Sequence, residues 1–267
     1  MSRIEQKLED IRQRGDKALV PFLTAGDPDM KTTVDLIHAL VESGADLIEL
    51  GVPFSDPMAD GPTIQASSER ALKSGTTVAG VLEIVRDVRK SSNVPIILMG
   101  YYNPIFHYGP SRFTVDAAAA GVDGLLLVDL PPEETAEIHA DMQKQGLDLI
   151  TLLAPTTPDE RMTVLAEKAE GYLYYVSMTG VTGSQQVDAA SIESAVRRIQ
   201  EKSRVQVAVG FGISTRDDAA AVSAFADAVV VGSALVKVIE AHGKSDELLP
   251  RVREFVSSLK EGVRPAA

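Results

Sequence analysis

The chain alternates short apolar runs with segments of helical periodicity. The apolar runs mostly lack the alternating polar positions of a strand with one face in water, as is typical of strands covered on both faces. We predict strands at 18–23, 46–50, 94–99, 124–130, 147–153, 172–177, 205–210 and 227–232.

Helical spacing appears between these runs and at the N-terminus. Ile4, Leu8 and Ile11 share one helical face, and Ser2 and Glu5 have the spacing of a capping box. Additional helices are predicted near 62–74, between the second and third strands, and at 233–242, before the final helix within 246–260.

Four strand entries resemble one another: SGADLIEL, AGVDGLLL, QGLDLITL and AFADAVVV. Each places an aspartate at or just before the strand, and repeated βα units indicate a parallel sheet. Eight strands in a chain of 267 residues favour an α/β fold, a (β/α)₈ barrel with an N-terminal helix and extra short helices after strands 2 and 8. A doubly wound open sheet is the alternative. Because no linker-like tract interrupts the chain, we expect residues 1–267 to form one domain.

Composition narrows the possible partners. The formal charge of −12 argues against nucleic acid or an anionic membrane as a ligand, since both require a basic surface. The absence of cysteine excludes disulfides and thiolate metal sites. No apolar stretch has transmembrane length, and the N-terminus lacks a signal-like apolar core, so we expect a cytoplasmic protein.

An acidic residue interrupts the second predicted strand, in the stretch DLIELGVPFSDPMADGPTIQ (46–65). If Ile48 and Leu50 face the surrounding helices, Glu49 faces the barrel interior near the carboxyl end of the strand, where such barrels hold their active sites. Burial would raise its pKa towards neutrality and suit it to proton transfer. The alternative is a structural glutamate paired with a buried lysine or arginine.

Asp60 follows in the same stretch, after a loop containing Pro53 and Pro57. Because Gly61 and Pro62 come next and a helix is predicted there, the local pattern favours Asp60 as a helix N-cap over a catalytic group. Asp56 has the pattern of a turn residue.

Glycine-rich segments follow the last three predicted strands: MTGVTGSQQ, GFGIST and GSALVKVIEAHG. Phosphate sites in these barrels are commonly built from the loops after strands seven and eight and from a short extra helix. Backbone amides and the helix dipole can bind a dianion without lysine. We therefore predict phosphate binding.

Other chemistries find little support. The histidines at 38, 107, 139 and 242 have no paired metal-ligand spacing, so no metal site is expected. The chain also lacks a nucleophile elbow and a complete dinucleotide fingerprint.

The run ELGVPFSDPMADGPTIQ, together with PFLTAGDP, GLLLVDLPPEE, VSMTGVTG, VGFGIS and VVGSALV, resembles the tryptophan synthase α subunit family over nearly the whole chain. The resemblance implies a lyase that cleaves indole-3-glycerol phosphate to indole and glyceraldehyde 3-phosphate. It implies that Glu49 transfers protons and that an ionised Asp60 accepts the indole N–H, which makes Asp60 catalytic where its local pattern favoured a cap.

The same resemblance assigns further contacts. It places phosphate at Gly183, Phe211, Gly212, Gly232 and Ser233, and indole at Phe22, Met99, Leu126, Tyr174 and Phe211, with Met99 standing where leucine is frequent. The segment 178–190, which includes Thr182, resembles a lid that closes over substrate.

The resemblance also implies a partner. A pyridoxal-phosphate β subunit would receive indole in an assembly of two α and two β chains, so this chain would need no cofactor of its own. The loops at 53–60 and 101–108 lie where the family contacts that partner, and YYNPIF is apolar for an exposed loop. The alternatives are another phosphate-binding barrel, such as a sugar-phosphate isomerase or indole-glycerol-phosphate synthase, and a non-catalytic homologue that only binds a partner.

Overall fold

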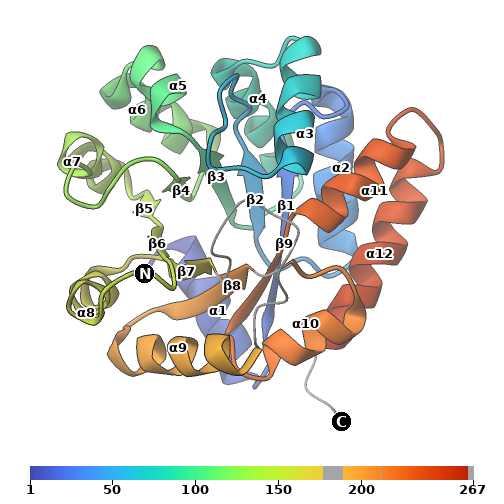
Figure 1. The fold of residues 1–267 in the computed structure, drawn as a ribbon. Helices are drawn as coiled ribbons and strands as arrows, with labels where there is room; N and C mark the ends of the chain where they lie inside the picture. Colours follow the sequence, from blue (N-terminus) through green and yellow to red (C-terminus); the bar gives the residue numbers. More distant parts are fainter. Residues whose placement is uncertain (177–188, 211, 264–267) are drawn as a thin grey trace.

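The computed structural model describes residues 1–176, 189–210 and 212–263, which form a nearly closed parallel barrel with helices around it (Figure 1). The strands are β1 (Ala18–Thr24), β2 (Ile48–Gly51), β3 (Ile96–Gly100), β4 (Gly124–Leu127), β5 (Asp148–Leu149), β6 (Thr151–Leu153), β7 (Tyr172–Val176), β8 (Gln206–Gly210) and β9 (Ala228–Val231). The helices are α1 (Arg3–Gln13), α2 (Met30–Glu42), α3 (Pro62–Lys73), α4 (Val78–Arg89), α5 (Tyr102–Tyr108), α6 (Pro110–Ala120), α7 (Ala136–Gln145), α8 (Asp159–Lys168), α9 (Ala189–Lys202), α10 (Arg216–Ser223), α11 (Ser233–His242) and α12 (Leu248–Val263).

The predicted barrel is confirmed, and the open doubly wound sheet is wrong. Hydrogen-bonded neighbours run in the order β5-β4-β3-β2-β1-β9-β8-β7-β6, and all pairs are parallel. The strand predicted at 147–153 is divided at Ile150, because its first half pairs with β4 and its second half with β7. This change of partner brings the two ends of the sheet together.

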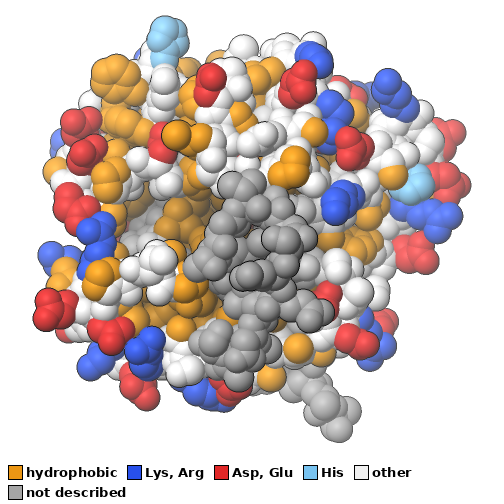
Figure 2. Space-filling model, in the orientation of Figure 1, with side chains coloured by type: hydrophobic (Ala, Val, Ile, Leu, Met, Phe, Trp, Pro, Cys, Tyr) orange, Lys and Arg blue, Asp and Glu red, His pale blue; other side chains and the backbone are white. Residues whose placement is uncertain are grey.

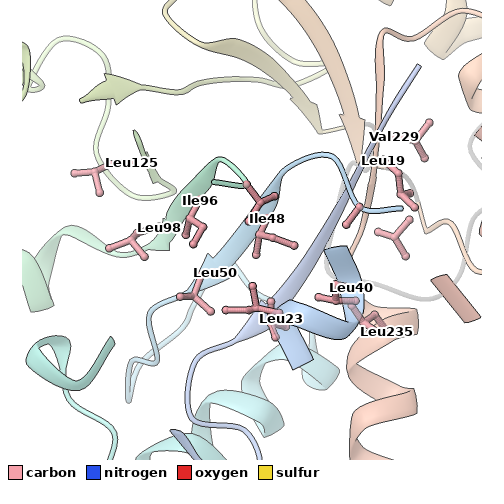
Figure 3. Close-up of a cluster of buried hydrophobic side chains, with 14 of the residues drawn as sticks. Leu19, Leu23, Leu40, Ile48, Leu50, Ile96, Leu98, Leu125, Val229 and Leu235 are labelled. Carbon is pink, nitrogen blue, oxygen red and sulfur yellow. The ribbon is translucent and has the colours of Figure 1, made fainter. Parts of the chain in front are cut away.

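Side chains alternate between two hydrophobic layers along each strand. In the outer layer, Ile48 and Leu50 of β2 pack against the helices, where Leu40 of α2 and Leu235 of α11 approach Leu23 (Figure 3). The inner layer fills the barrel with residues such as Leu47, and the predicted orientation of β2 is therefore confirmed. Since every inward position faces the same confined space, a polar side chain there is removed from water.

Helix α1 covers the end of the barrel at which the strands begin. Ile4, Leu8 and Ile11 are buried within the inner layer, and the predicted capping box of Ser2 and Glu5 is present. With this end closed, access to the barrel interior is from the carboxyl ends of the strands.

The repeated aspartates at the strand entries tie neighbouring strands together. Asp46 accepts the Leu19 N–H at 2.9 Å, and Asp227 accepts the Val207 N–H at 3.0 Å. Asp123 makes the same bond to β3, whereas the Asp148 side chain accepts the hydroxyl of Ser2. The repeat in the sequence is thus a hydrogen-bonding device for aligning adjacent strands.

Most of the predicted helices are confirmed, with one correction. Residues 101–108 were expected to be a loop, but Tyr102–Tyr108 form helix α5. Pro104 is tolerated because it lies in the first turn, and Gly109 ends the helix with a φ of 97°. None of the helices in the described ranges is long and apolar enough to cross a bilayer.

Candidate active site

Glu49 lies inside the barrel and is fully buried, with an exposed fraction of 0%. Its Oε1 accepts the Tyr172 hydroxyl at 2.6 Å, while Oε2 has no hydrogen-bond partner among the described residues. No lysine or arginine of the described chain forms an ion pair with it. The described residues therefore give no support to a structural ion pair at this position.

Burial without a cation changes the proton affinity of Glu49. Desolvation disfavours the charged carboxylate and raises its pKa to about 8, while the bond from Tyr172 acts in the opposite direction. The group thus holds a proton at neutral pH and can lose it at moderate cost. This is the property expected of a group that both gives and accepts a proton.

Tyr172 reaches Glu49 from the far side of the barrel. It begins β7, four positions from β2 around the ring, and its side chain belongs to the inner layer. Burial and the neighbouring Glu49 raise its pKa well above the usual value, so the hydroxyl remains a donor. Tyr172 was not singled out from the sequence. The feature that could have marked it is the presence of three tyrosines in the short predicted strand YLYYVS.

Asp60 does not cap α3, so the local expectation of an N-cap is wrong. Gly61 is the N-cap and makes no side-chain cap bond. Asp60 instead accepts the Tyr101 hydroxyl at 3.0 Å, and the same hydroxyl accepts the Ala59 N–H at 2.9 Å. The Phe54 ring packs 5.2 Å from the Tyr101 ring, so Tyr101 holds both ends of the loop that leads to Asp60.

The pKa of Asp60 is raised by burial, and the bond from Tyr101 opposes the shift. The resemblance implied an ionised Asp60, and desolvation works against that state. A positive charge developing nearby on a ligand would favour it.

A pocket with about 280 Å³ of empty space, part of it open to solvent, lies beside Asp60 at the carboxyl ends of β1–β4. Figure 2 shows hydrophobic side chains in a hollow on this face. The residues lining the pocket are Phe22, Thr24, Gly51, Val52, Asp60, Ile64, Ser68, Met99, Gly100, Tyr101 and Val128. Apolar walls with a few polar groups are typical of a small-molecule binding site.

Glu49 lies one inward position deeper than this pocket. Gly51 is the next inward residue of β2, and it lines the pocket where Glu49 does not. A Cβ at Gly51 would stand 2.6 Å from Cζ of Phe22, so only glycine admits the Phe22 ring here. The catalytic candidates therefore occupy two levels, with Asp60 at the pocket and Glu49 beneath it.

The predicted contact residues divide into several groups. Phe22 and Met99 line the pocket with Asp60, whereas Leu126 and Tyr174 lie in the inner layer of the barrel. Gly232 packs beside Phe22 and caps α11, which Ser233 begins.

Gly212 follows β8 with a φ of 37°. Thr182, Gly183 and Phe211, with most of the segment 178–190, lie outside the described residues.

Sequence reasoning missed several lining residues, namely Thr24, Ile64, Ser68 and Tyr101. Tyr101 directly follows a strand, a position that could have marked it. Ser68 and Ile64 lie within a helix, and their direction depends on how α3 packs. In the described part of the chain, no cluster of three acidic or histidine side chains forms a metal-binding group.

Buried and loop carboxyl groups near the carboxyl ends of parallel strands, beside an apolar pocket and a glycine-capped helix, define an enzyme of the (β/α)₈ barrel class. The family model for the tryptophan synthase alpha chain matches residues 8–264. The chain therefore belongs to the tryptophan synthase alpha chain family.

Individual relatives agree over the full length. The tryptophan synthase alpha chain of Geobacter sulfurreducens is 57% identical over 263 residues, covering 98% of this chain and 99% of the relative. The crystal structure of subunit alpha from Legionella pneumophila has a TM-score of 0.91 at 44% identity, covering 98% of each chain. An aminoacrylate-bound tryptophan synthase from M. tuberculosis has a TM-score of 0.88 at 36% identity, covering 99% of this chain and 100% of that one.

Family membership gives the activity. The chain is the enzyme subunit that cleaves indole-3-glycerol phosphate to indole and glyceraldehyde 3-phosphate in tryptophan biosynthesis. Membership of this family also implies that the partner of the chain is a β subunit.

The pKa of Glu49 predicts a pH-dependent stability. Between its ordinary value of 4.5 and about 8, the folded chain holds a proton that the unfolded chain releases. The free energy of unfolding of wild type, relative to Glu49→Gln, should therefore fall with rising pH by at most roughly 1.4 kcal/mol per unit. Urea denaturation of both proteins at about pH 5, 6.5 and 8 measures this difference. A difference that stays constant over this range would contradict the raised pKa.

Proposed function

We propose that Glu49 and Asp60 are the groups that perform the cleavage of indole-3-glycerol phosphate in this chain. The observation that carries the proposal is Glu49 itself, a buried carboxyl group with no cationic partner among the described residues and a pKa of about 8. It lies directly beneath an apolar pocket that has a second carboxyl group, Asp60, in its wall.

Glu49 is assigned the proton transfers. The bond between indole C3 and the glycerol chain breaks when C3 gains a proton and the adjacent side-chain hydroxyl loses one, which leaves indole and an aldehyde. A protonated Glu49 can donate to C3 and, once ionised, accept the hydroxyl proton. The unpartnered Oε2 supports this role, because the Tyr172 bond occupies only Oε1.

Asp60 is assigned the stabilisation of the intermediate. Protonation at C3 places positive charge on the indole ring nitrogen, and a carboxylate accepting the ring N–H stabilises that charge. The charge in turn favours the ionised form of Asp60, against the effect of burial. Tyr101 keeps the carboxylate at the pocket wall through its hydroxyl.

The phosphate group is assigned to the start of α11. Gly232 caps this helix without a side-chain bond, so amides of its first turn remain available for an anion. Gly232 lies beside Phe22, which places the phosphate end next to the indole pocket. Ser233 and Gly212 complete the described part of the site, and the resemblance adds Gly183 and Phe211. Backbone amides explain how an acidic protein binds a dianion.

The partner surface is assigned to the loop 53–60 and helix α5. Met58 and Phe106 are large apolar side chains with exposed fractions of 81% and 63%. Exposed apolar groups of this size, close to the pocket wall built by Tyr101, fit a partner that receives indole. We assign pyridoxal phosphate to that β subunit, and an assembly of two α and two β chains.

The whole chain, residues 1–267, is proposed to act as one domain in the cytoplasm. A sequence without cysteine needs no oxidising compartment for disulfide formation.

Replacement of Glu49 by glutamine should abolish cleavage. The amide keeps the size of the side chain but cannot transfer a proton, so we expect kcat for indole release to fall by about 10²- to 10⁴-fold. Release of indole from indole-3-glycerol phosphate by the purified chain measures this. The exposed Glu160→Gln in α8 is the matched control. Full activity of folded Glu49→Gln would refute the assignment.

Asp60→Asn should lower kcat by about 10²-fold, because an amide oxygen accepts the ring N–H without neutralising the developing charge. The same assay reports the loss. Asp56→Asn, in an exposed turn of the same loop, should retain wild-type activity. If Asp60→Asn and Asp56→Asn behave alike, Asp60 has no catalytic role.

Mixing the chain with its β subunit should give a particle with the mass of two α and two β chains in light scattering after gel filtration. Phe106→Asp should weaken this assembly by about tenfold or more, since a buried charge would face an apolar partner surface. Val164→Asp, on the exposed face of α8, should leave it unchanged. A particle of one α and one β chain would exclude the proposed stoichiometry.

A further inference from the structure

Arg70 of α3 joins two carboxylates that belong to different parts of the barrel. Its Nε and Nη2 donate to the two carboxylate oxygens of Asp27 at 2.9 and 2.8 Å, and its Nη1 donates to Glu240 at 2.7 Å. Asp27 lies in the loop after β1 and is 2% exposed, whereas Glu240 lies in α11 and is exposed. One guanidinium group therefore connects β1, α3 and α11.

These three elements build the two ends of the proposed substrate site. β1 and α3 supply pocket residues such as Phe22 and Ile64, and α3 starts directly after the loop that carries Asp60. Helix α11 begins at the proposed phosphate site. Figure 1 shows α3 and α11 next to each other at this side of the barrel, and the two helices are in contact.

Arg70 supplies a polar contact between the two ends, in addition to the packing of α11 against β1 and α3. The hydrogen bond between Thr24 and Ser67 already links α3 to β1 at 2.6 Å. Among the described residues, the polar contact between α3 and α11 is the one from Arg70 to Glu240. Without that contact, α11 would be held against α3 by packing alone, and small displacements of the phosphate end relative to the indole end would cost less energy.

We propose that Arg70 is a positioning residue that fixes the distance between the indole pocket and the phosphate site. The inference rests on the proposed function, because it needs both ends to bind one substrate. A ligand that spans two sites gains affinity only when their separation matches its length. A small displacement of such a site also lowers the rate of the chemical step.

The chemistry of the side chain fits this role. The planar guanidinium binds Asp27 with two donors and still presents a third to Glu240, which a lysine ammonium cannot do in the same geometry. The Asp27 bond also compensates a buried charge, so Arg70→Ala would leave that charge unpaired and perturb folding. The exposed Glu240 contributes little to folding, and its role in linking the helices can be tested separately.

The test uses Glu240→Gln and Arg70→Lys. Glu240→Gln weakens the contact between Arg70 and α11 and leaves the hydrogen bonds to Asp27 in place. Arg70→Lys retains the positive charge beside Asp27 but cannot donate to both Asp27 oxygens and to Glu240 at the same time. Arg253→Gln is the matched control, since Arg253 joins α12 to Glu42 of α2 in a comparable exposed pair outside the site. Each substitution is made in wild type and in the Glu49→Gln chain, in which substrate binding can be measured without turnover.

Affinity is measured for three ligands: indole, glycerol 3-phosphate and indole-3-glycerol phosphate. The first two each occupy one end of the site, whereas the third spans both ends and is therefore sensitive to the distance between them. We expect Kd for indole and for glycerol 3-phosphate to change by less than about twofold, while Kd for indole-3-glycerol phosphate rises about 3- to 10-fold in Glu240→Gln and further in Arg70→Lys. In the wild-type background, kcat/KM should fall at least as much as affinity, and Arg253→Gln should change neither.

Two results would overturn the inference. One is unchanged binding and turnover of indole-3-glycerol phosphate in Glu240→Gln, which keeps its fold. The other is a loss of affinity for either fragment as large as the loss for the whole substrate, which would indicate local damage. A folded Glu49→Gln chain that still releases indole at the wild-type rate would instead overturn the proposed function. The comparison of Glu240→Gln with wild type does not depend on that result, so the two failures are distinguishable.

Discussion

The removal of the Glu49 carboxyl group from water is the constraint on which the site depends. The barrel leaves this side chain with one hydrogen bond, from Tyr172, and no positive charge from the described residues. Solvation that would keep the group ionised is lost, and its pKa rises to about 8. A surface glutamate could not hold a proton at neutral pH, so the chemistry proposed for Glu49 follows from the closed interior.

Burial of a carboxyl group inside the barrel lowers the stability of the fold, and hydrophobic packing elsewhere in the structure offsets this loss. The surrounding layers of aliphatic side chains supply the compensating burial. Helix α1 covers the end of the barrel at which the strands begin. The aspartates at the strand entries align neighbouring strands by accepting hydrogen bonds from backbone amides. The acidic character of the chain is no obstacle to the phosphate site proposed at α11, because backbone amides at the start of a helix can hold an anion.

Sequence patterns predicted the regular parts of this molecule well and the local exceptions poorly. The barrel, the orientation of Glu49 and the helix at 233–242 all follow from periodicity and glycine positions. The N-cap expected of Asp60 is wrong because Gly61 takes that position and Tyr101, from another strand end, captures the carboxylate. Residues 102–108 form a helix although the resemblance had placed a loop there. For Asp60, a hydrogen bond from a residue distant in the chain outweighed the local capping pattern. For residues 102–108, the glycine at 109 ends a short helix that the prediction had not included.

The sequence by itself determined the order of strands and helices, the inward direction of Glu49 and, through its motifs, the family. These properties depend on side-chain alternation and on residues close together in the chain. Only the tertiary structure decided that Tyr172 reaches Glu49 across the barrel, that Ile64 and Ser68 face the pocket, and that Arg70 joins three elements. Such contacts arise from packing between segments that are far apart in the chain. The periodicity of hydrophobic residues within one segment does not determine which distant segment it will contact.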